Sequence, residues 1–318
     1  PRRLPPIAKE AQISTELAEL VGLLLGDGCL CKRTPEISLG AKKAKIAEAL
    51  PDLIKELPDL KINKSDRSHN NCSCYRFVLK SHKQNPINPL TSLLEDLGVM
   101  GLGACDKYIP KVIMEGPTPV IVAVLKGLFG TDGSLSICKG DKVDLSFTSA
   151  SEKMVRQVQQ LLLHLNIISR VRSRTVKNQS HKLFKRWTLE VVDVHAKLQF
   201  LTTVGTYDKE KTEKFILILN DKLKVKRSPF MDLIPHEVWG LIRKERGEIP
   251  WSKITPPGLV RAEDIYTKKR IGTSRRVVKW VGEKLNSAPI LNLAESDIYW
   301  NKIVSIEPIG IKSTYDLR

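Results

Sequence analysis

One sequence pattern occurs twice in this chain and constrains the fold more than any other feature. The first copy is LVGLLLGDGCL at residues 20–30, and the second is LKGLFGTDGSL at residues 125–135. In each copy a glycine precedes an aspartate by five residues and a second glycine follows it; the aspartates are Asp27 and Asp132. They are 105 residues apart, a plausible length for one small domain. The repeat therefore predicts a chain built from two related halves.

Each copy is predicted to be a helix that ends at its aspartate. Ser14 or Thr15 is the candidate N-cap of the first helix, and Thr118, followed by a proline, is the candidate N-cap of the second. We expect Gly28 and Gly133 to stop the helices in a left-handed conformation.

Small residues recur on one face of both predicted helices. Gly22 and Gly26 in the first, and Gly127 and Thr131 in the second, are spaced i, i+4. Because glycine inside a helix costs about 1 kcal/mol relative to alanine, the spacing predicts that another backbone comes very close. The other copy is the obvious partner, and this pairing places both acids at one end.

Two neighbouring carboxylates repel each other unless a cation lies between them, and the negative ends of two helix dipoles favour a cation further. Paired carboxylates with room for water and phosphate oxygens suit Mg²⁺ (or Mn²⁺). The candidate metal site consists of Asp27 and Asp132 with the preceding residues Gly26 and Thr131. The alternative is a repeated helical hairpin whose aspartates have no metal; we favour the metal because the small-residue face, the acid and the final glycine recur in register.

Both stretches resemble the signature helix of the LAGLIDADG homing endonucleases, in the single-chain form with two pseudo-symmetric halves. Gly22 and Gly127 match the first glycine of that motif, and the two aspartates match its metal-binding final acid. Leu25 and Gly130 replace a noncatalytic acid of the motif. The resemblance implies an α+β fold: two pseudo-symmetric αββαββα halves packed through the paired motif helices, with a small C-terminal helical tail and a short intein-like β segment.

The resemblance also implies one lysine for each half, which orients water and offsets charge at the scissile phosphate. In inteins of the family this lysine follows its acid at a distance close to the one here. Lys107, in DKYIPK, lies 80 residues after Asp27, and Lys211 lies 79 residues after Asp132. Lys209 is the alternative to Lys211.

Hydrophobic periodicity predicts the order helix, hairpin, helix, hairpin, helix in each half. In the first half the elements after the motif helix are a strand-like run over 29–40, a helix over 42–57, strands over 60–65 and 73–79, and a helix over 88–97. In the second half they are strands over 135–138 and 143–148, a helix over 151–165, strands over 169–176 and 183–192, and a helix through residue 200.

The net charge indicates a polyanionic partner. Lysine and arginine number 52 against 35 acidic residues, a formal charge of +17. Membrane lipid is the weaker candidate, because no long apolar run, signal peptide or single amphipathic basic helix is present. A ribosome-binding protein has a similar composition, so charge alone decides little.

Basic residues gather on the predicted strands. Arg170, Arg172 and Arg174 alternate and so point to one side of a sheet. A solvated outer face is the usual meaning of such alternation, but a twisted sheet in a DNA major groove reads bases with arginine in the same way. The candidate contacts to double-stranded DNA are Lys32, Arg33, Arg67, Arg76, Lys80, Arg170, Arg172, Arg174, Lys182 and Arg186.

After residue 223 the composition shifts to a basic helical tail, residues 224–291. A helix is predicted near 236–246, and TSRRVVKWVGEKLNS suggests a second one with Thr273 or Ser274 as its cap. Arg275 and Arg276 in its first turn are candidate DNA contacts. Its apolar stripe, from Val277 to Leu285, serves equally to dock it on the endonuclease core.

The six cysteines include two Cys-x-Cys pairs, Cys29 with Cys31 and Cys72 with Cys74. Zinc sites usually have two or more residues between paired ligands, whereas one intervening residue puts both thiols on one face of a strand. We therefore favour reduced cysteines in a cytoplasmic protein over a zinc site.

Both ends of the chain resemble replicative-helicase inteins of the cyanobacterial type. Residues 1–13 resemble the linker from the splicing domain, and residues 292–318 a residual splicing-domain β segment. The two halves are then 14–115 and 116–223. The nucleophile, the Thr-x-x-His block and the terminal His-Asn of an intein are missing, so we expect this chain to cut DNA but not to splice protein.

The expected function is site-specific, double-strand cleavage of DNA at a long asymmetric site in an intein-less host gene, by a monomer without an obligatory protein partner. The alternative is a noncatalytic nucleic-acid-binding relative, either a maturase-like RNA binder or a transcription regulator.

Overall fold

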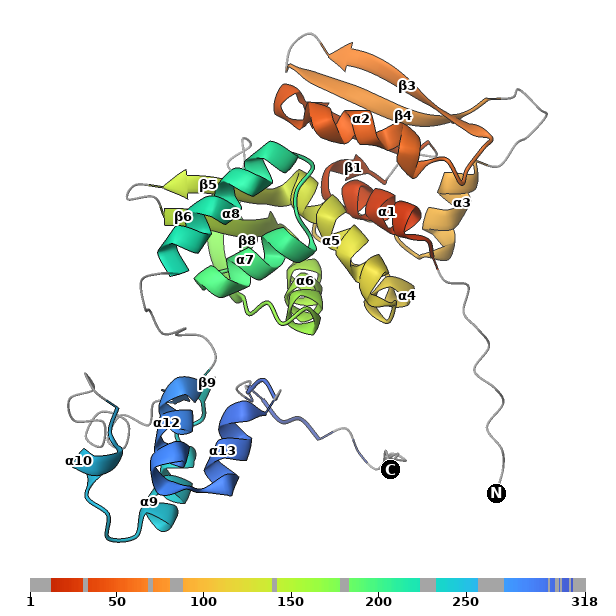
Figure 1. Cartoon of the computed structure of the whole chain (residues 1–318). Coiled ribbons are helices and arrows are strands. Elements are labelled where there is room, and N and C mark those ends of the chain that lie inside the picture. Colours follow the sequence, from red (N-terminus) through yellow and green to blue (C-terminus); the bar gives the residue numbers. More distant parts are fainter. Residues whose placement is uncertain are drawn as a thin grey trace. The chain divides into compact units, whose positions relative to one another are not determined.

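A computed structural model describes most of the chain as two compact units, residues 1–227 and 228–318 (Figure 1). The residues described are 13–30, 34–67, 71–80, 88–138, 142–177, 183–223, 233–256, 272–296 and scattered positions from 298 to 310. Within them no helix has the length and apolar character needed to cross a membrane. The half boundaries expected at residues 115 and 223 stay predictions.

The first unit contains the same order of elements twice. Its first half consists of α1 (Thr15–Asp27), β1 (Gly28–Cys29), β2 (Glu36–Gly40), the 3-10 turn η1 (Ala41–Lys43), α2 (Ala44–Leu53), β3 (Leu60–Arg67), β4 (Cys72–Leu79), α3 (Pro89–Asp96) and α4 (Lys111–Met114). The second half consists of α5 (Thr118–Asp132), β5 (Gly133–Cys138), β6 (Lys142–Ser149), α6 (Glu152–His164), β7 (Arg170–Lys177), β8 (Leu183–Glu190), α7 (Val194–Thr203) and α8 (Lys209–Leu223).

Each half forms one antiparallel four-stranded sheet. The strand orders are β1-β2-β4-β3 and β5-β6-β8-β7, so the two sheets have the same topology. One face of each sheet packs on a shared hydrophobic core that includes Phe77 from the first half and Phe147 from the second, both fully buried. The α+β class and the αββαββα plan are therefore confirmed, and α8 is a helix that the periodicity did not predict.

The motif helices α1 and α5 pack side by side, as their small residues predict (Figure 1). A Cβ atom on Gly22 would lie 2.4 Å from the carbonyl oxygen of Val124, and one on Gly127 would lie 2.3 Å from the carbonyl oxygen of Glu19. No side chain larger than hydrogen fits at either position without moving a backbone. The glycines therefore set how closely the two halves approach.

The helix ends differ from the predictions in two respects. Ser14 caps α1 by accepting a hydrogen bond from the backbone N–H of Leu17, but α5 begins at Thr118 after Pro117, and Thr118 is not its cap. Gly28 and Gly133 follow the helices in extended conformations, with φ of −77° and −82°, so the predicted left-handed stop is wrong. Glycine is needed there for space, because a Cβ would lie 2.3 Å from the carbonyl oxygen four residues earlier in each helix.

The second unit has its own small core. Its elements are β9 (Leu233–Ile234), α9 (Val238–Arg246), α10 (Trp251–Ile254), β10 (Thr273–Ser274), α12 (Arg275–Leu285) and α13 (Ala288–Glu295). The apolar stripe of α12 packs within this unit, where Val277, Val278 and Val281 are buried with Trp239 and Ile290. The predicted β segment near residues 296–317 lies largely outside the described residues, and those described there form no strand.

Candidate active site

The parallel packing of α1 and α5 brings Asp27 and Asp132 together at the C-terminal ends of the two helices. Burial and the neighbouring charge of Asp27 raise the pKa of Asp132 to about 6, although Lys107, Lys43 and Arg186 act in the opposite direction. Two acids and three cations therefore share one site. This arrangement fits the predicted pair of interacting carboxylates.

Lys107 lies at the end of α1, as the spacing from Asp27 suggested. Its side chain is buried, and its ammonium donates to the carbonyl oxygens of Leu24 at 3.3 Å, Gly26 at 3.0 Å and Gly28 at 3.0 Å. These carbonyls carry the negative end of the helix dipole. Lys107 is thereby held in place beside the acids.

Lys43 is a site residue that the sequence reasoning missed. It ends the 3-10 turn η1, and its ammonium donates both to the carboxylate of Asp27 and, at 2.7 Å, to the carbonyl oxygen of Thr131 in the opposite helix. Lysines 42, 43 and 45 follow one another closely in AKKAKIAEAL. Nothing in that run distinguishes Lys43, so only the fold selects it.

An open pocket of about 240 Å³ lies on the Asp132 side of the site. Lys107 and Arg186 contribute positive charge to its lining, and Thr148 and Ser149 contribute hydroxyl groups. Phe184 contributes an exposed aromatic ring. Carboxylate, ammonium, guanidinium and hydroxyl groups around one open space suit an anion that reaches the acids from outside, such as a phosphate group.

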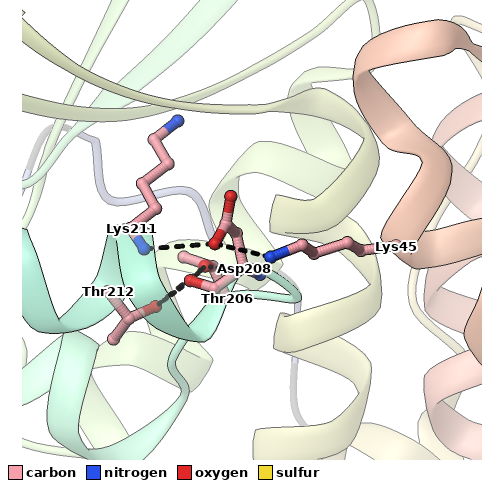
Figure 2. A network of polar contacts seen from close by, with 5 residues as sticks. All are labelled: Lys45, Thr206, Asp208, Lys211 and Thr212. Carbon is pink, nitrogen blue, oxygen red and sulfur yellow. Dashed lines mark hydrogen bonds and ion pairs between the residues drawn. The ribbon is translucent and has the colours of Figure 1, made fainter.

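The structure does not bring Lys211 to this site. Lys211 is exposed on α8, and its ammonium lies 5.9 Å from the centre of the Phe215 ring. Figure 2 shows the side chain pointing away from Asp208, to which the backbone N–H of Lys211 donates. Asp208 instead pairs with Lys45 of the first half at 3.0 Å. Lys209, the alternative, is also exposed on α8.

The residues at the helix ends fit a hard divalent cation. In the described part of the chain no three His, Cys, Asp or Glu side chains gather around a common point, so two carboxylates leave most positions to carbonyl, water and phosphate oxygens, as Mg²⁺ prefers. The hydroxyl of Thr131 bonds back to the carbonyls of Gly127 and Leu128. At Thr131, as at Gly26, an ion would therefore use the carbonyl oxygen, which accepts a hydrogen bond from Lys43 or Lys107, respectively, in this structure.

The second sheet carries a basic face on the same side as the pocket. Strand pairing places Arg170 opposite Glu190, Arg172 opposite Thr188 and Arg174 opposite Arg186. Arg170 forms an ion pair with Glu190 at 2.7 Å, which holds the pKa of that carboxyl below its ordinary value. Arg172 also lies 3.8 Å from the same carboxylate. The predicted arginine row is confirmed as one face, and two of its members share the charge of Glu190.

The first sheet has a less uniform face. Arg76 is exposed but donates at 2.8 Å to the buried carboxylate of Glu36, opposite it on the neighbouring strand. Lys80 is exposed just after β4. Cys72 and Cys74 lie on the same face as Arg76, and the described cysteines are free thiols. The remaining predicted contacts Lys32, Arg33 and Lys182, and the side chain of Arg67, lie outside the described residues.

Arg275 of the second unit has a structural role. Its guanidinium donates to the carbonyl oxygens of Leu293, Ala294 and Ser296, at 3.3, 3.2 and 2.6 Å, and so closes the end of α13. We therefore remove Arg275 from the proposed DNA contacts. Arg276 is exposed on α12 and stays a candidate.

A sequence model of the family described as LAGLIDADG-like domain matches residues 119–215. The chain carries a LAGLIDADG-like domain. The match covers α5, both hairpins of the second sheet and the start of α8. The resemblance drawn from the two motif helices is thereby confirmed, and the first half repeats the topology of the LAGLIDADG-like domain.

Curated relatives match as parts of longer proteins. The chain is 28% identical over 326 residues to "Replicative DNA helicase DnaB" of Synechocystis sp.. The aligned region covers the whole of this chain and 36% of the helicase. It is 26% identical over 227 residues to "Replication factor C small subunit" of Methanocaldococcus jannaschii, which covers 71% of this chain and 11% of that protein. The chain thus spans about a third of the helicase's length and a smaller share, 11%, of the replication factor subunit.

A solved structure of I-DmoI in complex with DNA and Ca is similar in fold. The TM-score is 0.44 at 17% identity, over 64% of this chain and 98% of that one.

Proposed function

We propose that this chain is a site-specific, double-strand DNA endonuclease that uses divalent metal, Mg²⁺ or Mn²⁺. The observation that carries the proposal is the convergence of Asp27 and Asp132 at the ends of the two packed motif helices, where burial and mutual repulsion raise the pKa of Asp132 to about 6. A site that brings two carboxylates together at this cost suits a cation.

In this proposal each group has a stated role. Asp27, Asp132 and the carbonyls of Gly26 and Thr131 hold the metal, which when bound activates water and offsets charge on the phosphate. Lys107 and Arg186 orient the scissile phosphate in the pocket beside Asp132. The basic faces of the two sheets hold a long DNA site, asymmetric because the two halves differ in sequence.

The relatives support an inserted module as the origin of the chain. A helicase and a replication factor subunit have different functions by name, yet each matches this chain over a minor part of its own length. An intein with its own endonuclease explains a shared segment in unrelated hosts. We therefore propose an intein-less replicative helicase gene as the target, and a monomer as the active form.

The test is a cleavage assay with Mg²⁺ and plasmid DNA that carries the uninterrupted helicase gene from the genome that encodes this chain. We expect one double-strand cut by the parent chain. Asp27→Asn or Asp132→Asn should abolish double-strand cleavage while specific binding stays within a few-fold, because affinity comes mainly from phosphate and base contacts. Double-strand cutting by both single variants at the parental rate contradicts the paired-acid site.

A noncatalytic binder of RNA or DNA on the same scaffold is the second candidate. The basic sheet face alone fits it, but the half-buried acid pair and the lysines held beside it have no task in binding an anion. Tight binding of the target without any cut at saturating Mg²⁺ or Mn²⁺ favours this candidate.

A further inference from the structure

The ammonium of Lys43 occupies a position that joins the two halves. It contacts the carboxylate of Asp27, the last residue of α1, and the carbonyl oxygen of Thr131, next to last in α5. Both acceptors belong to the set proposed above to hold a metal. A positive group therefore already lies between oxygens that a cation would use.

The setting distinguishes this contact from an ordinary surface ion pair. Side-chain exposure is 29% for Lys43 and 27% for Asp27. In contrast, Asp52 of α2 and Lys55, just after that helix, form a pair with 69% and 73% exposure. Exposed pairs contribute little because water screens them. At the helix ends water is partly excluded, and two helix dipoles and a second acid add to the attraction.

Lys43 differs from the other cations of the site in what it contacts. Lys107 donates to three carbonyls of α1. Arg186 lies on the Asp132 side, in the lining of the pocket. Lys43 donates to the carboxylate of Asp27 and to a carbonyl of α5, and so joins the ends of the two motif helices.

We propose that Lys43 is a built-in counter-ion of the acid pair, and that a divalent metal must displace its ammonium from Asp27 and the carbonyl of Thr131 in order to bind. The inference rests on the proposed function, because it takes the acids to be the metal site. The lysine keeps the site stable without metal, and it weakens metal binding in proportion to the time it occupies the position. If Lys43 occupies the position in nine molecules out of ten, the apparent dissociation constant is weakened about ten-fold.

The test measures Mn²⁺ binding to the full chain by calorimetry and by electron paramagnetic resonance, without DNA and with a target duplex. Lys43→Met removes the competing charge and should bind Mn²⁺ about ten-fold more tightly than the parent without DNA. In chelator the same variant should have a lower Tm than the parent, and added Mn²⁺ should raise its Tm more.

Lys42→Met is the matched control, because Lys42 is the exposed neighbour in the same turn and loses the same charge. It should bind Mn²⁺ like the parent. If Lys43→Met does not fold, Lys43→Gln keeps a polar side chain without the charge and should show the same direction. Asp27→Asn identifies the site, since it should lose the Mn²⁺ signal.

The outcomes separate the two proposals. If Lys43→Met binds Mn²⁺ as tightly as the parent or more weakly, and Asp27→Asn still removes the Mn²⁺ signal, the counter-ion role is overturned. The endonuclease proposal then stands. A Mn²⁺ signal that neither Asp27→Asn nor Asp132→Asn changes, or no saturable binding with DNA present, contradicts the metal site and with it both proposals.

Discussion

Asp27 and Asp132 end equivalent helices, yet their surroundings are unequal. Asp27 has the ammonium of Lys43 as a hydrogen-bond donor. Asp132 faces the open pocket, and burial together with the charge of Asp27 outweighs the cations near it and raises its pKa to about 6. The raised pKa thus belongs to the carboxylate that lines the open pocket, so the charge of Asp132 changes near neutral pH.

This raised pKa predicts a specific pH dependence of stability in metal-free protein. The folded state keeps a proton on Asp132 up to pH about 6, whereas the unfolded chain loses it near the ordinary value of 3.8. The contribution of Asp132 to the free energy of unfolding is therefore fully present below the unfolded pKa and is lost as pH rises through about 6. Relative to the parent, Asp132→Asn should gain up to about 3 kcal/mol of unfolding free energy between pH 4 and pH 7.5, at about 1.4 kcal/mol per pKa unit.

Urea denaturation in chelator, compared between the two proteins at each pH, measures this gain. Asp52→Asn removes an exposed acid of α2 and should show no such pH-dependent difference. If the difference in unfolding free energy between Asp132→Asn and the parent stays constant from pH 4 to 7.5, the raised pKa of Asp132 is contradicted.

Sequence reasoning identified the acids but not all of their neighbours, for a physical reason. Asp27 and Asp132 stand at a fixed place in a repeated pattern, and a helix places its last residue predictably. Lys43 and Arg186 reach the same site from η1 and β8, whose positions depend on tertiary packing. The resemblance and the distance along the chain from Asp132 predict Lys211, but neither says where a side chain points.

At the scale of elements, the close approach of α1 and α5 predicts that both motif glycines resist substitution. Alanine is intrinsically better than glycine in a helix by about 1 kcal/mol. Gly22→Ala or Gly127→Ala should nevertheless lose roughly 2 kcal/mol or more, because the added Cβ meets backbone atoms of the partner helix at 2.4 and 2.3 Å. Thermal unfolding of the first unit measures the loss.

Gly240 in α9 gives the opposite control. A Cβ there meets nothing within 4 Å, so Gly240→Ala should raise the Tm of the second unit slightly. Equal stabilisation by Gly22→Ala would falsify the close packing of the motif helices.

The order of strands and the last residue of each motif helix were predictable, but the backbone conformation of the glycine that follows each helix was not. Side-chain periodicity distinguishes strand from helix, so the β3–β4, β5–β6 and β7–β8 hairpins were placed within a few residues, whereas β1 and β2 were predicted as one strand-like run over 29–40. Gly28 and Gly133 adopt extended conformations because the chain turns directly into β1 and β5 after each acid. A glycine after a helix is compatible with either geometry, and the strand that follows decides which one forms.

The basic face of the β7–β8 hairpin predicts the salt dependence of DNA binding. Each phosphate contact that is lost should reduce the slope of log affinity against log salt by about 0.9. Arg172→Ala and Arg174→Ala should each weaken binding to duplex DNA of arbitrary sequence and flatten this slope. Fluorescence anisotropy in chelator at several salt concentrations measures both quantities.

Arg156→Ala is the matched control. Arg156 lies on α6 beside the ring of Trp187, on the opposite face of the same sheet from Arg186. Arg156→Ala removes an equal charge and should leave the slope of log affinity against log salt unchanged. An equal flattening by Arg156→Ala means that net charge, and not this face, binds DNA.

At the scale of the whole molecule, the two halves share a topology but have not kept equivalent chemistry. Lys107 of the first half is buried against α1, whereas Lys211 of the second half is exposed on α8, away from the acids. Lys43, again from the first half, contacts the end of α5. The first half therefore supplies lysines to both motif helices, and the site is more asymmetric than the repeated motif suggests.

This asymmetry predicts unequal effects of the lysines on cleavage. Lys107→Met should slow double-strand cutting by at least about ten-fold and accumulate nicked plasmid, because removal of one electrostatic group at a reacting phosphate typically costs that much or more. DNA affinity should change little. Lys211→Met should cut both strands near the parental rate, since its ammonium lies beside Phe215 and not beside either acid. Time courses of supercoiled, nicked and linear plasmid distinguish the two variants. If Lys211→Met accumulates as much nicked plasmid as Lys107→Met, α8 must bring its lysine to the acids when DNA is bound, and Lys211 regains the role that spacing and the family resemblance predict for it.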